Sequence, residues 1–281
     1  MSFSCCRSQL LCLLSLFLSF GLTMPWAVAQ SLRVSPLVIQ TQSEREQARG
    51  LIEVTNTGKI PLRARVYAVP FTYNRQGLET LSSSSHDLRP YLSFSPKELI
   101  LEPNQTRTIR FNARFPQDVT DGEYRALLYL DQLVEREPNN TKPTVVIKTR
   151  LGITVYVNKG KNLPALSLLK ATYEPQQRQI VLLVNNSGKV TVRPRTTWQI
   201  SQATTSVAEG TNDETTVIAN GDRYLTIPYP PAGQILKAGT YNIKGELNWQ
   251  FPQSGNLSFQ LPLVISDQDA RIVNQSSGNK P

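Results

Sequence analysis

The chain has 281 residues, of which 40% are hydrophobic and 18% charged, and its formal net charge is +9. A chain of this length can bury one or two hydrophobic cores. The basic residues are scattered on alternating positions and are not gathered in a run, which argues against a nucleic acid partner and favours solvated faces of strands.

The first 29 residues have the pattern of a cleaved signal peptide. Arg7 supplies the positive start, an apolar run extends from Leu10 to Leu22, and Ala27-Val28-Ala29 provides the small residues of a cleavage site. The apolar run is shorter than the ~20 residues that span a bilayer. We therefore expect an exported protein without stable membrane insertion. Arg7 is the only charged residue removed, so the net charge would fall from +9 to +8.

The residue types that carry chemistry are scarce in the remaining chain. All three cysteines lie in the leader, so neither a disulfide nor a thiol nucleophile is expected. The single histidine, His86, stands in a polar insert at positions 74–90 that we expect to be an exposed loop. The sequence has no Gly-rich phosphate loop, no metal-binding His cluster and no nucleophile-elbow serine. We expect no catalytic residue, no cofactor and no metal site.

Strand-like runs with turn residues between them fill the chain from position 30 onward. Their lengths and spacing are typical of antiparallel sandwiches. In chain order the runs read GLIEVTN, LRARVYAVPF, TRTIRFNARF, YRALLYLDQL, TVVIKTRLGITVYV, QIVLLVNNSG, YNIKGELNWQF and LSFQLPLVIS. Helical periodicity is almost absent, and the predicted class is all-β.

An internal repeat divides the chain into two halves. VTNTGKIPLRAR begins at Val54 and VNNSGKVTVRPR begins at Val184, and six of the twelve positions are identical. Both segments read as a strand, an Asn-x-Gly-Lys turn and a second strand, which favours duplication over chance similarity of hairpins.

A second pair of segments supports the repeat. Tyr124 and Tyr241 each stand two residues after a turn glycine, at the start of a strand. This is the pattern of a tyrosine corner in immunoglobulin-like sandwiches, where the hydroxyl bonds to upstream backbone. An ordinary tyrosine at a strand start is the alternative for either instance alone.

We therefore predict two tandem immunoglobulin-like β-sandwich domains. The expected ranges are a signal peptide at 1–29, a first domain at 30–158, a linker at 159–164, a second domain at 165–266 and a disordered tail at 267–281.

The segment TKPTVVIKTRLGITVYV, at positions 141–157, is the most informative for function. Alternate positions from Val145 to Val157 are apolar, interrupted by Thr149, and the other positions include Lys148 and Arg150. The run is longer than the usual five or six residues of a strand. Its apolar face around Ile153 must be core. Its first half could instead form an exposed edge that adds to a partner's sheet.

The leader, the two sandwiches, EVTNTGKIPLRARV, DGEYRALLYLDQL and the long last strand of the first domain together resemble the PapD-like periplasmic pilus chaperones. That resemblance implies two sandwiches in an L shape and a periplasmic location. It also implies that the last strand of the first domain is lent to a pilus or fimbrial subunit. An outer-membrane usher would be a further partner. Self-association through the exposed strand also stays open.

The resemblance also implies site residues. The strand-lending positions are Val145, Ile147, Thr149 and Leu151. In the family, a basic pair in the cleft between the domains anchors the carboxylate at the subunit's C-terminus. Arg150 matches the strand lysine best and Lys148 second, while Arg33 is the nearest candidate on the first strand. Arg33 lies ahead of the expected place, where Ser35 or Leu37 falls instead, and the Arg-Pro that commonly ends the lending strand is missing.

Three interpretations of the function follow. The first is a non-enzymatic assembly chaperone that holds an exported subunit by donating a strand. The alternative is a structural or adhesive envelope protein that uses its sandwiches as a passive interaction module. The third is an enzyme or a carbohydrate-binding module, and no residue pattern in the sequence supports it.

Overall fold

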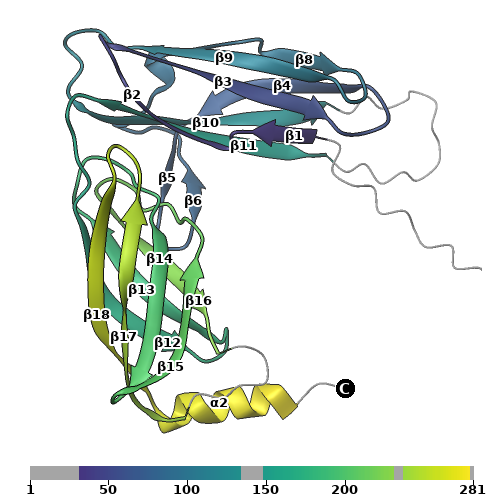
Figure 1. Cartoon of the computed structure of the whole chain (residues 1–281). Coiled ribbons are helices and arrows are strands. Elements are labelled where there is room, and N and C mark those ends of the chain that lie inside the picture. The colour runs from purple at the N-terminus through teal and green to yellow at the C-terminus, as the bar shows by residue number, and fades with distance from the viewer. Residues whose placement is uncertain (1–31, 134–147, 231–236, 279–281) are drawn as a thin grey trace, which may run out of the picture.

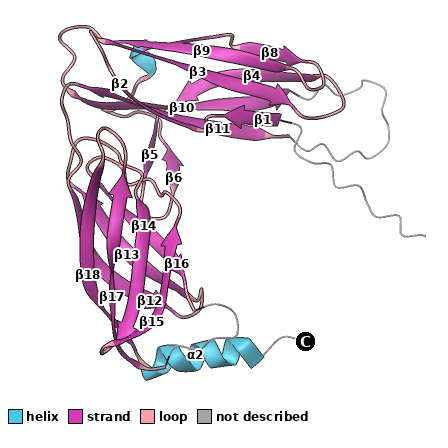
Figure 2. Cartoon of the chain, viewed as in Figure 1, coloured by secondary structure: helices cyan, strands magenta, loops and turns pink. Residues whose placement is uncertain are grey.

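The computed structural model describes residues 32–133, 148–230 and 237–278. These residues form two β-sandwiches that together make an L (Figure 1), and almost all regular structure in them is strand (Figure 2). The prediction of an all-β chain with two tandem sandwiches is confirmed. No helix among the described residues is long and apolar enough to cross a membrane. The expected signal peptide lies outside the described residues.

The first sandwich has two sheets around one core. The sheet that we call the distal sheet has the order β1 (Leu32–Ser35), β3 (Gln47–Asn56), β9 (Thr106–Arg114) and β7 (Leu92–Ser95). The sheet that we call the junction sheet has the order β2 (Val38–Gln42), β11 (Arg150–Lys159), β10 (Gly122–Leu133), β4 (Leu62–Val69) and β8 (Glu98–Leu101). Alternate apolar residues such as Ile52, Ile109 and Leu128 point into the core, as the period of a strand requires.

The polar insert differs from the expected exposed loop. Strands β5 (Phe71–Tyr73) and β6 (Leu78–Thr80) form a hairpin that extends from the first sandwich to the second, and a short 3-10 helix, η1 (Arg89–Tyr91), follows. His86 is half-buried, and its ring Nδ1 lies 3.1 Å from the carbonyl oxygen of Glu123. Part of the polar insert therefore makes contacts within the protein, as His86 does with Glu123.

The second sandwich pairs a three-stranded sheet with a four-stranded one. The first sheet contains β12 (Leu166–Glu174), β13 (Gln179–Asn186) and β16 (Gly221–Pro228). The second has the order β15 (Thr205–Asn212), β14 (Arg195–Gln202), β17 (Gly239–Trp249) and β18 (Gly255–Ile265). Their facing side chains form a separate core.

The C-terminal segment begins as a helix, where the sequence predicts a disordered tail. Helix α2 spans Asp267–Gly278. Ser266 accepts a hydrogen bond on its hydroxyl from the Asp269 N–H (3.1 Å), and Asp269 accepts one from the Ser266 N–H (3.0 Å). This reciprocal arrangement is a capping box, which satisfies backbone donors at a helix start.

The internal repeat has a physical basis in two buried asparagines. Asn56 donates to the carbonyls of Ile60 (2.8 Å) and Leu101 (3.0 Å) and accepts from the Gly58 N–H (2.8 Å). Asn186 makes the equivalent bonds to Val190, Val217 and Gly188. Each asparagine ties its turn to a neighbouring segment of the same sandwich, which explains why Asn-x-Gly recurs in both halves.

The two tyrosines of the repeat have the geometry that a tyrosine corner requires. The Tyr124 hydroxyl donates to the carbonyl of Thr120 at 3.0 Å, four residues upstream. The Tyr241 hydroxyl donates to the carbonyl of Lys237 at the same distance and spacing. Both rings are buried, so each corner fixes the entry into the strand that follows.

Candidate functional site

The last strand of the first sandwich is paired unequally on its two edges. One edge of β11 pairs with β10 along its whole length, from Arg150↔Asp131 to Lys159↔Gly122. The other edge pairs with β2 only from Thr154 to Asn158. The preceding strand, β1, pairs with β3 in the distal sheet and so does not continue β2 along β11. Within the described part of the chain, Arg150 to Ile153 therefore form an edge without a strand partner, which we call the open edge.

Hydrogen bonds at either end of the open edge indicate which backbone N–H and C=O groups face it. The Gln132 N–H donates to the carbonyl of Thr149 (3.0 Å), on the β10 side, and the Thr154 N–H donates to the carbonyl of Leu37 (3.0 Å), on the β2 side. Backbone groups of successive strand residues point to opposite edges. The N–H and C=O groups of Arg150 and Gly152 therefore face the open edge, where they can pair with an added strand.

The side chains beside this edge are partly apolar. Ile153 is buried in the core of the first sandwich, and Leu151 is partly buried against it. Leu37, which precedes β2 and whose carbonyl accepts the Thr154 N–H, is 50% exposed. A strand that pairs along the open edge would find both main-chain partners and apolar surface there.

Charged and aromatic side chains cluster on the outer face of the junction sheet near the open edge. The Arg150 guanidinium donates to both carboxylate oxygens of Asp131, at 2.6 and 2.9 Å, and the Tyr67 hydroxyl donates to Asp131 at 3.1 Å. The guanidinium carbon lies 4.9 Å from the ring centroid of Tyr129. The hydrogen bonds from Arg150 lower the pKa of Asp131, which keeps this carboxylate ionised. Arg150 is thus already engaged in a bidentate pair.

A buried network joins the two sandwiches at the other end of β10 and β11. The Glu123 carboxylate accepts hydrogen bonds from the Thr191 N–H (2.6 Å) and hydroxyl (2.5 Å), and it lies 3.3 Å from Arg125. Gln40 donates to the Thr191 carbonyl at 2.8 Å. Burial raises the pKa of Glu123, against the effect of Arg125 and the Thr191 donors. Because Glu123, Arg125 and Thr191 are buried and mutually bonded, they favour one orientation of the two domains.

The β5–β6 hairpin adds a second contact between the sandwiches. Arg75 forms a salt bridge with Asp222 on β16 at 2.9 Å. Arg223 donates to the carbonyl of Asn74 (3.2 Å), and its guanidinium lies 5.3 Å from the ring centroid of Tyr73. The hairpin therefore ties the first sandwich to the three-stranded sheet of the second.

The predicted strand-lending residues are only partly covered by the structure. Val145 and Ile147 lie outside the described residues. Thr149 is half-buried and immediately precedes β11, and Leu151 lies on the open edge. The prediction of strand donation from these four positions therefore stays a prediction.

The structure does not bring the residues of the predicted basic pair together, and their role as an anchor stays a prediction. Arg33 on β1 pairs with Thr55 and lies on the outer face of the distal sheet, whereas Arg150 lies on the outer face of the junction sheet. Arg150 is also eight residues along β11 from Asn158, the residue opposite the junction carboxylate Glu123, a span of about 26 Å. Lys148 is exposed just before β11. The two arginines are not brought together, because β1 belongs to the distal sheet and β11 to the junction sheet.

The residues at the junction were missed from the sequence. Glu123 and Thr191 are 68 residues apart and belong to no motif. One signal was available, since Glu123 precedes the corner tyrosine and therefore points to the opposite face of the sheet from the core. Among the described residues, no group of three or more His, Cys, Asp and Glu side chains could hold a metal ion.

Comparison with known proteins gives a likeness to solved structures alone. No family model and no curated protein matches the sequence. The chain is similar to the YadV chaperone, with 11% identity, a TM-score of 0.48, and coverage of 82% of this chain and 100% of that one. It is also similar to a chain in the CsuC–CsuE chaperone–tip subunit complex of Acinetobacter baumannii, with 13% identity, a TM-score of 0.47, and coverage of 83% and 97%.

A third likeness is to a chain in the complex of the Salmonella enterica SafA pilin with the SafB chaperone, with 12% identity, a TM-score of 0.47, and coverage of 84% and 96%. Chaperones of fimbriae and pili thus recur among these structures. With TM-scores below 0.5, these neighbours support no conclusion about this chain by themselves, and its function has to be argued from its own residues.

Proposed function

We propose that the chain is a periplasmic assembly chaperone that binds an exported pilus-type subunit by adding the last strand of its first domain to the subunit's sheet. The open edge of β11 supports this proposal. It offers N–H and C=O groups at Arg150 and Gly152 that have no strand partner among the described residues, beside the apolar side chain of Leu37. An exposed edge of this kind invites aggregation unless a partner uses it.

The two sides of β11 would have different tasks in this binding. Main-chain bonds along the open edge would supply affinity, and the alternate apolar positions Val145, Ile147 and Leu151 would enter pockets of the subunit. Arg150 would stay in its salt bridge with Asp131 and present a positioned positive charge beside the Tyr129 ring. No nucleotide is needed, because strand pairing itself stabilises the bound subunit.

Gly152 offers a test of the backbone pairing. Gly152→Pro removes the N–H that faces the open edge and leaves the bonds to β10 in place, because those bonds come from the neighbouring residues. Gly152→Ala is the matched control, since it keeps the N–H and its added Cβ meets the flexible end of Leu127 at 3.1 Å. Both variants are purified from periplasm with their bound proteins, which are identified by mass spectrometry.

We expect the subunit to co-purify with the parent chain and with Gly152→Ala, and to be lost from Gly152→Pro. Equal thermal unfolding of the two variants establishes that the loss is one of binding. A folded Gly152→Pro that retains every partner would show that the open edge is not the binding site.

Two side-chain variants complete this test. Val145→Asp/Ile147→Asp should also lose the subunit, because the carboxylates would enter its apolar pockets. Arg150→Ala should weaken binding if the arginine contacts the subunit. Unchanged co-purification of Arg150→Ala would remove the arginine from the binding site, even if strand donation holds.

A further inference from the structure

The outer face of the distal sheet gathers basic residues that are separate in the sequence. The strand register places Arg49 beside Asn112, Arg110 beside Leu51, and Arg114 beside Gln47, all outside the core. Arg33 lies on the same face at the β1 edge. Among the described residues of these four strands, Glu53 is the one acidic side chain on this face. Alternating basic positions in the sequence therefore become one positively charged surface, which we call the distal face.

The arginines of the distal face are not neutralised within the protein. Arg33, Arg110 and Arg114 have no acidic partner within 4.0 Å among the described residues, and Arg49 donates only to the neutral Gln47 side chain, at 3.2 Å. All four side chains are exposed. Their charge is consequently available to an external partner.

The corresponding outer face of the second sandwich is different. On the four-stranded sheet, the outward basic residues Arg195 and Lys244 are balanced by two outward acidic residues, Glu209 and Glu246. A net positive charge is thus a property of the distal face and does not follow from the sandwich fold.

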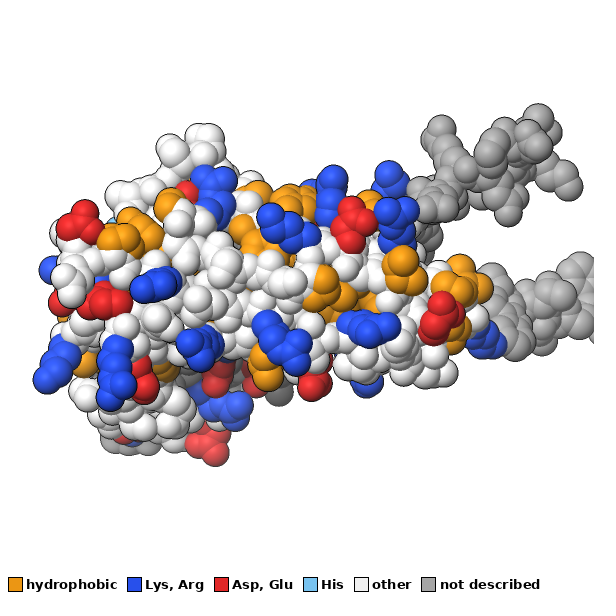
Figure 3. All heavy atoms as spheres, turned by 90° about the horizontal axis from the view of Figure 1, so that it is seen from above, with side chains coloured by type: hydrophobic (Ala, Val, Ile, Leu, Met, Phe, Trp, Pro, Cys, Tyr) orange, Lys and Arg blue, Asp and Glu red, His pale blue; other side chains and the backbone are white. Residues whose placement is uncertain are grey.

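The distal face is unobstructed by the second domain. The junction network is built on the outer face of the junction sheet, through Glu123 and Gln40, so the distal sheet points away from the second sandwich (Figure 1). Figure 3 looks down on the molecule from above Figure 1 and shows more blue than red side chains across the first sandwich. A flat partner could approach this side without meeting the second domain.

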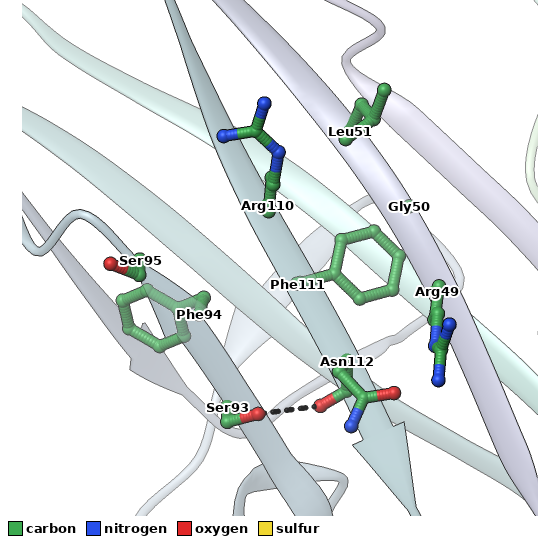
Figure 4. A pocket seen from close by; sticks show the side chains of 9 residues that line it. All are labelled: Arg49, Gly50, Leu51, Ser93, Phe94, Ser95, Arg110, Phe111 and Asn112. Atoms are coloured by element: carbon green, nitrogen blue, oxygen red, sulfur yellow. Dashed lines mark hydrogen bonds between the residues drawn. The ribbon is translucent and has the colours of Figure 1, made fainter.

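An apolar side chain stands within the charged surface. Leu51 is 58% exposed between Arg49 and Arg110. These residues and the serines of β7 line a shallow hollow of about 480 Å³ (Figure 4). Beneath it, on the core side of the sheet, the Phe111 ring fills the space that a Cβ at Gly50 would occupy. Guanidinium donors around an exposed leucine suit a surface with phosphate groups above an apolar layer.

We propose that the distal face binds the surface of a membrane that contains anionic phospholipids. The arginines contact lipid phosphates, and Leu51 enters the boundary between headgroups and acyl chains. This contact is peripheral to the membrane, because it consists of four arginine side chains and one leucine side chain. It is independent of the proposed chaperone function, which uses β11 and the junction sheet.

Vesicle co-sedimentation of the mature chain tests the proposal. Binding to vesicles of phosphatidylglycerol and phosphatidylcholine is compared with binding to phosphatidylcholine alone, at ~0.1 M and ~0.5 M salt, since salt screens charges beyond a few ångströms. Arg49→Gln/Arg110→Gln removes two charges from the distal face. Lys170→Gln/Lys244→Gln removes two exposed charges from the second sandwich and is the matched control.

We expect binding to anionic vesicles alone, weaker at high salt. Each basic residue near such a surface changes partitioning by about fivefold, so the arginine variant should bind about 25-fold more weakly and the lysine variant nearly as well as the parent chain. Equal binding to neutral vesicles, or equal losses in the two variants, would overturn the proposal. Subunit co-purification with the arginine variant reports separately on the chaperone function.

Discussion

The hydroxyl of Thr191 should be a main determinant of the stability of the junction. It donates to Glu123 at 2.5 Å and accepts from the Ala219 N–H at 3.0 Å, in a fully buried position. Thr191→Val keeps the shape and the backbone N–H but removes both of these bonds. Thr191→Ser is the control, because it keeps the hydroxyl and loses only a methyl group.

The expected cost follows from these two bonds. A hydrogen bond to a charged group contributes ~1.5–3 kcal/mol, and a buried donor left without an acceptor costs ~1–3 kcal/mol. Thr191→Val should therefore lower the free energy of unfolding by about 3–5 kcal/mol, and Thr191→Ser by about 1 kcal/mol. Arg125 remains beside Glu123 in both variants, which keeps the estimate toward the lower end.

Tryptophan fluorescence during urea denaturation at pH 7 measures this effect. Of the three tryptophans, Trp26 lies in the expected leader, so Trp198 and Trp249 report on the second sandwich, which contains Thr191. Small-angle scattering of the two variants measures whether the L opens. A loss below ~1 kcal/mol in Thr191→Val with an unchanged scattering profile would refute the assigned role of the hydroxyl.

Three further predictions concern stability and pH. Tyr124→Phe and Tyr241→Phe should each cost about 1 kcal/mol in denaturant unfolding, because each removes one hydroxyl-to-carbonyl bond; no loss in either would contradict the tyrosine-corner role. Asn56→Ala should cost ~2–4 kcal/mol in the same assay, since it leaves two carbonyls and the Gly58 N–H without their partner, and a cost near zero would contradict it. Burial and Arg125 lower the pKa of His86, so stability should be full above about pH 6.5 and fall as the pH drops below this value. NMR titration of this single histidine should give a pKa below 6.5, His86→Gln should flatten the loss of stability, and a pKa at or above 6.5 would contradict the reasoning.

The repeated features could be predicted because each is local in the sequence. Asn56 and Asn186 bond within their own turns, and Tyr124 and Tyr241 reach back four residues. The spacing of these residues in the sequence is therefore enough to predict their hydrogen bonds within each turn and corner. Together with strand alternation, this is enough to predict two sandwiches of the immunoglobulin type.

The junction and the basic pair depend on pairings that spacing does not encode. Glu123 meets Thr191 across 68 residues, and Arg75 meets Asp222 across 147. The resemblance to the chaperone family is what suggests Arg33 and Arg150 as a pair. Arg33 lies on β1 in the distal sheet and Arg150 on β11 in the junction sheet, which places the two arginines on opposite outer faces. Only the observed sheet order could show this.

The open edge and the distal face belong to different sides of one sandwich, and this has a consequence for how the protein would work. A strand added at β11 extends the junction sheet sideways, whereas a membrane under the distal face covers the opposite sheet. Neither contact blocks the other. The junction network around Glu123 and Thr191 and the hairpin clamp at Arg75 and Asp222 hold the second sandwich on the side away from the distal face. A chain docked on a membrane would thus keep its open edge accessible to a subunit that arrives from the same membrane.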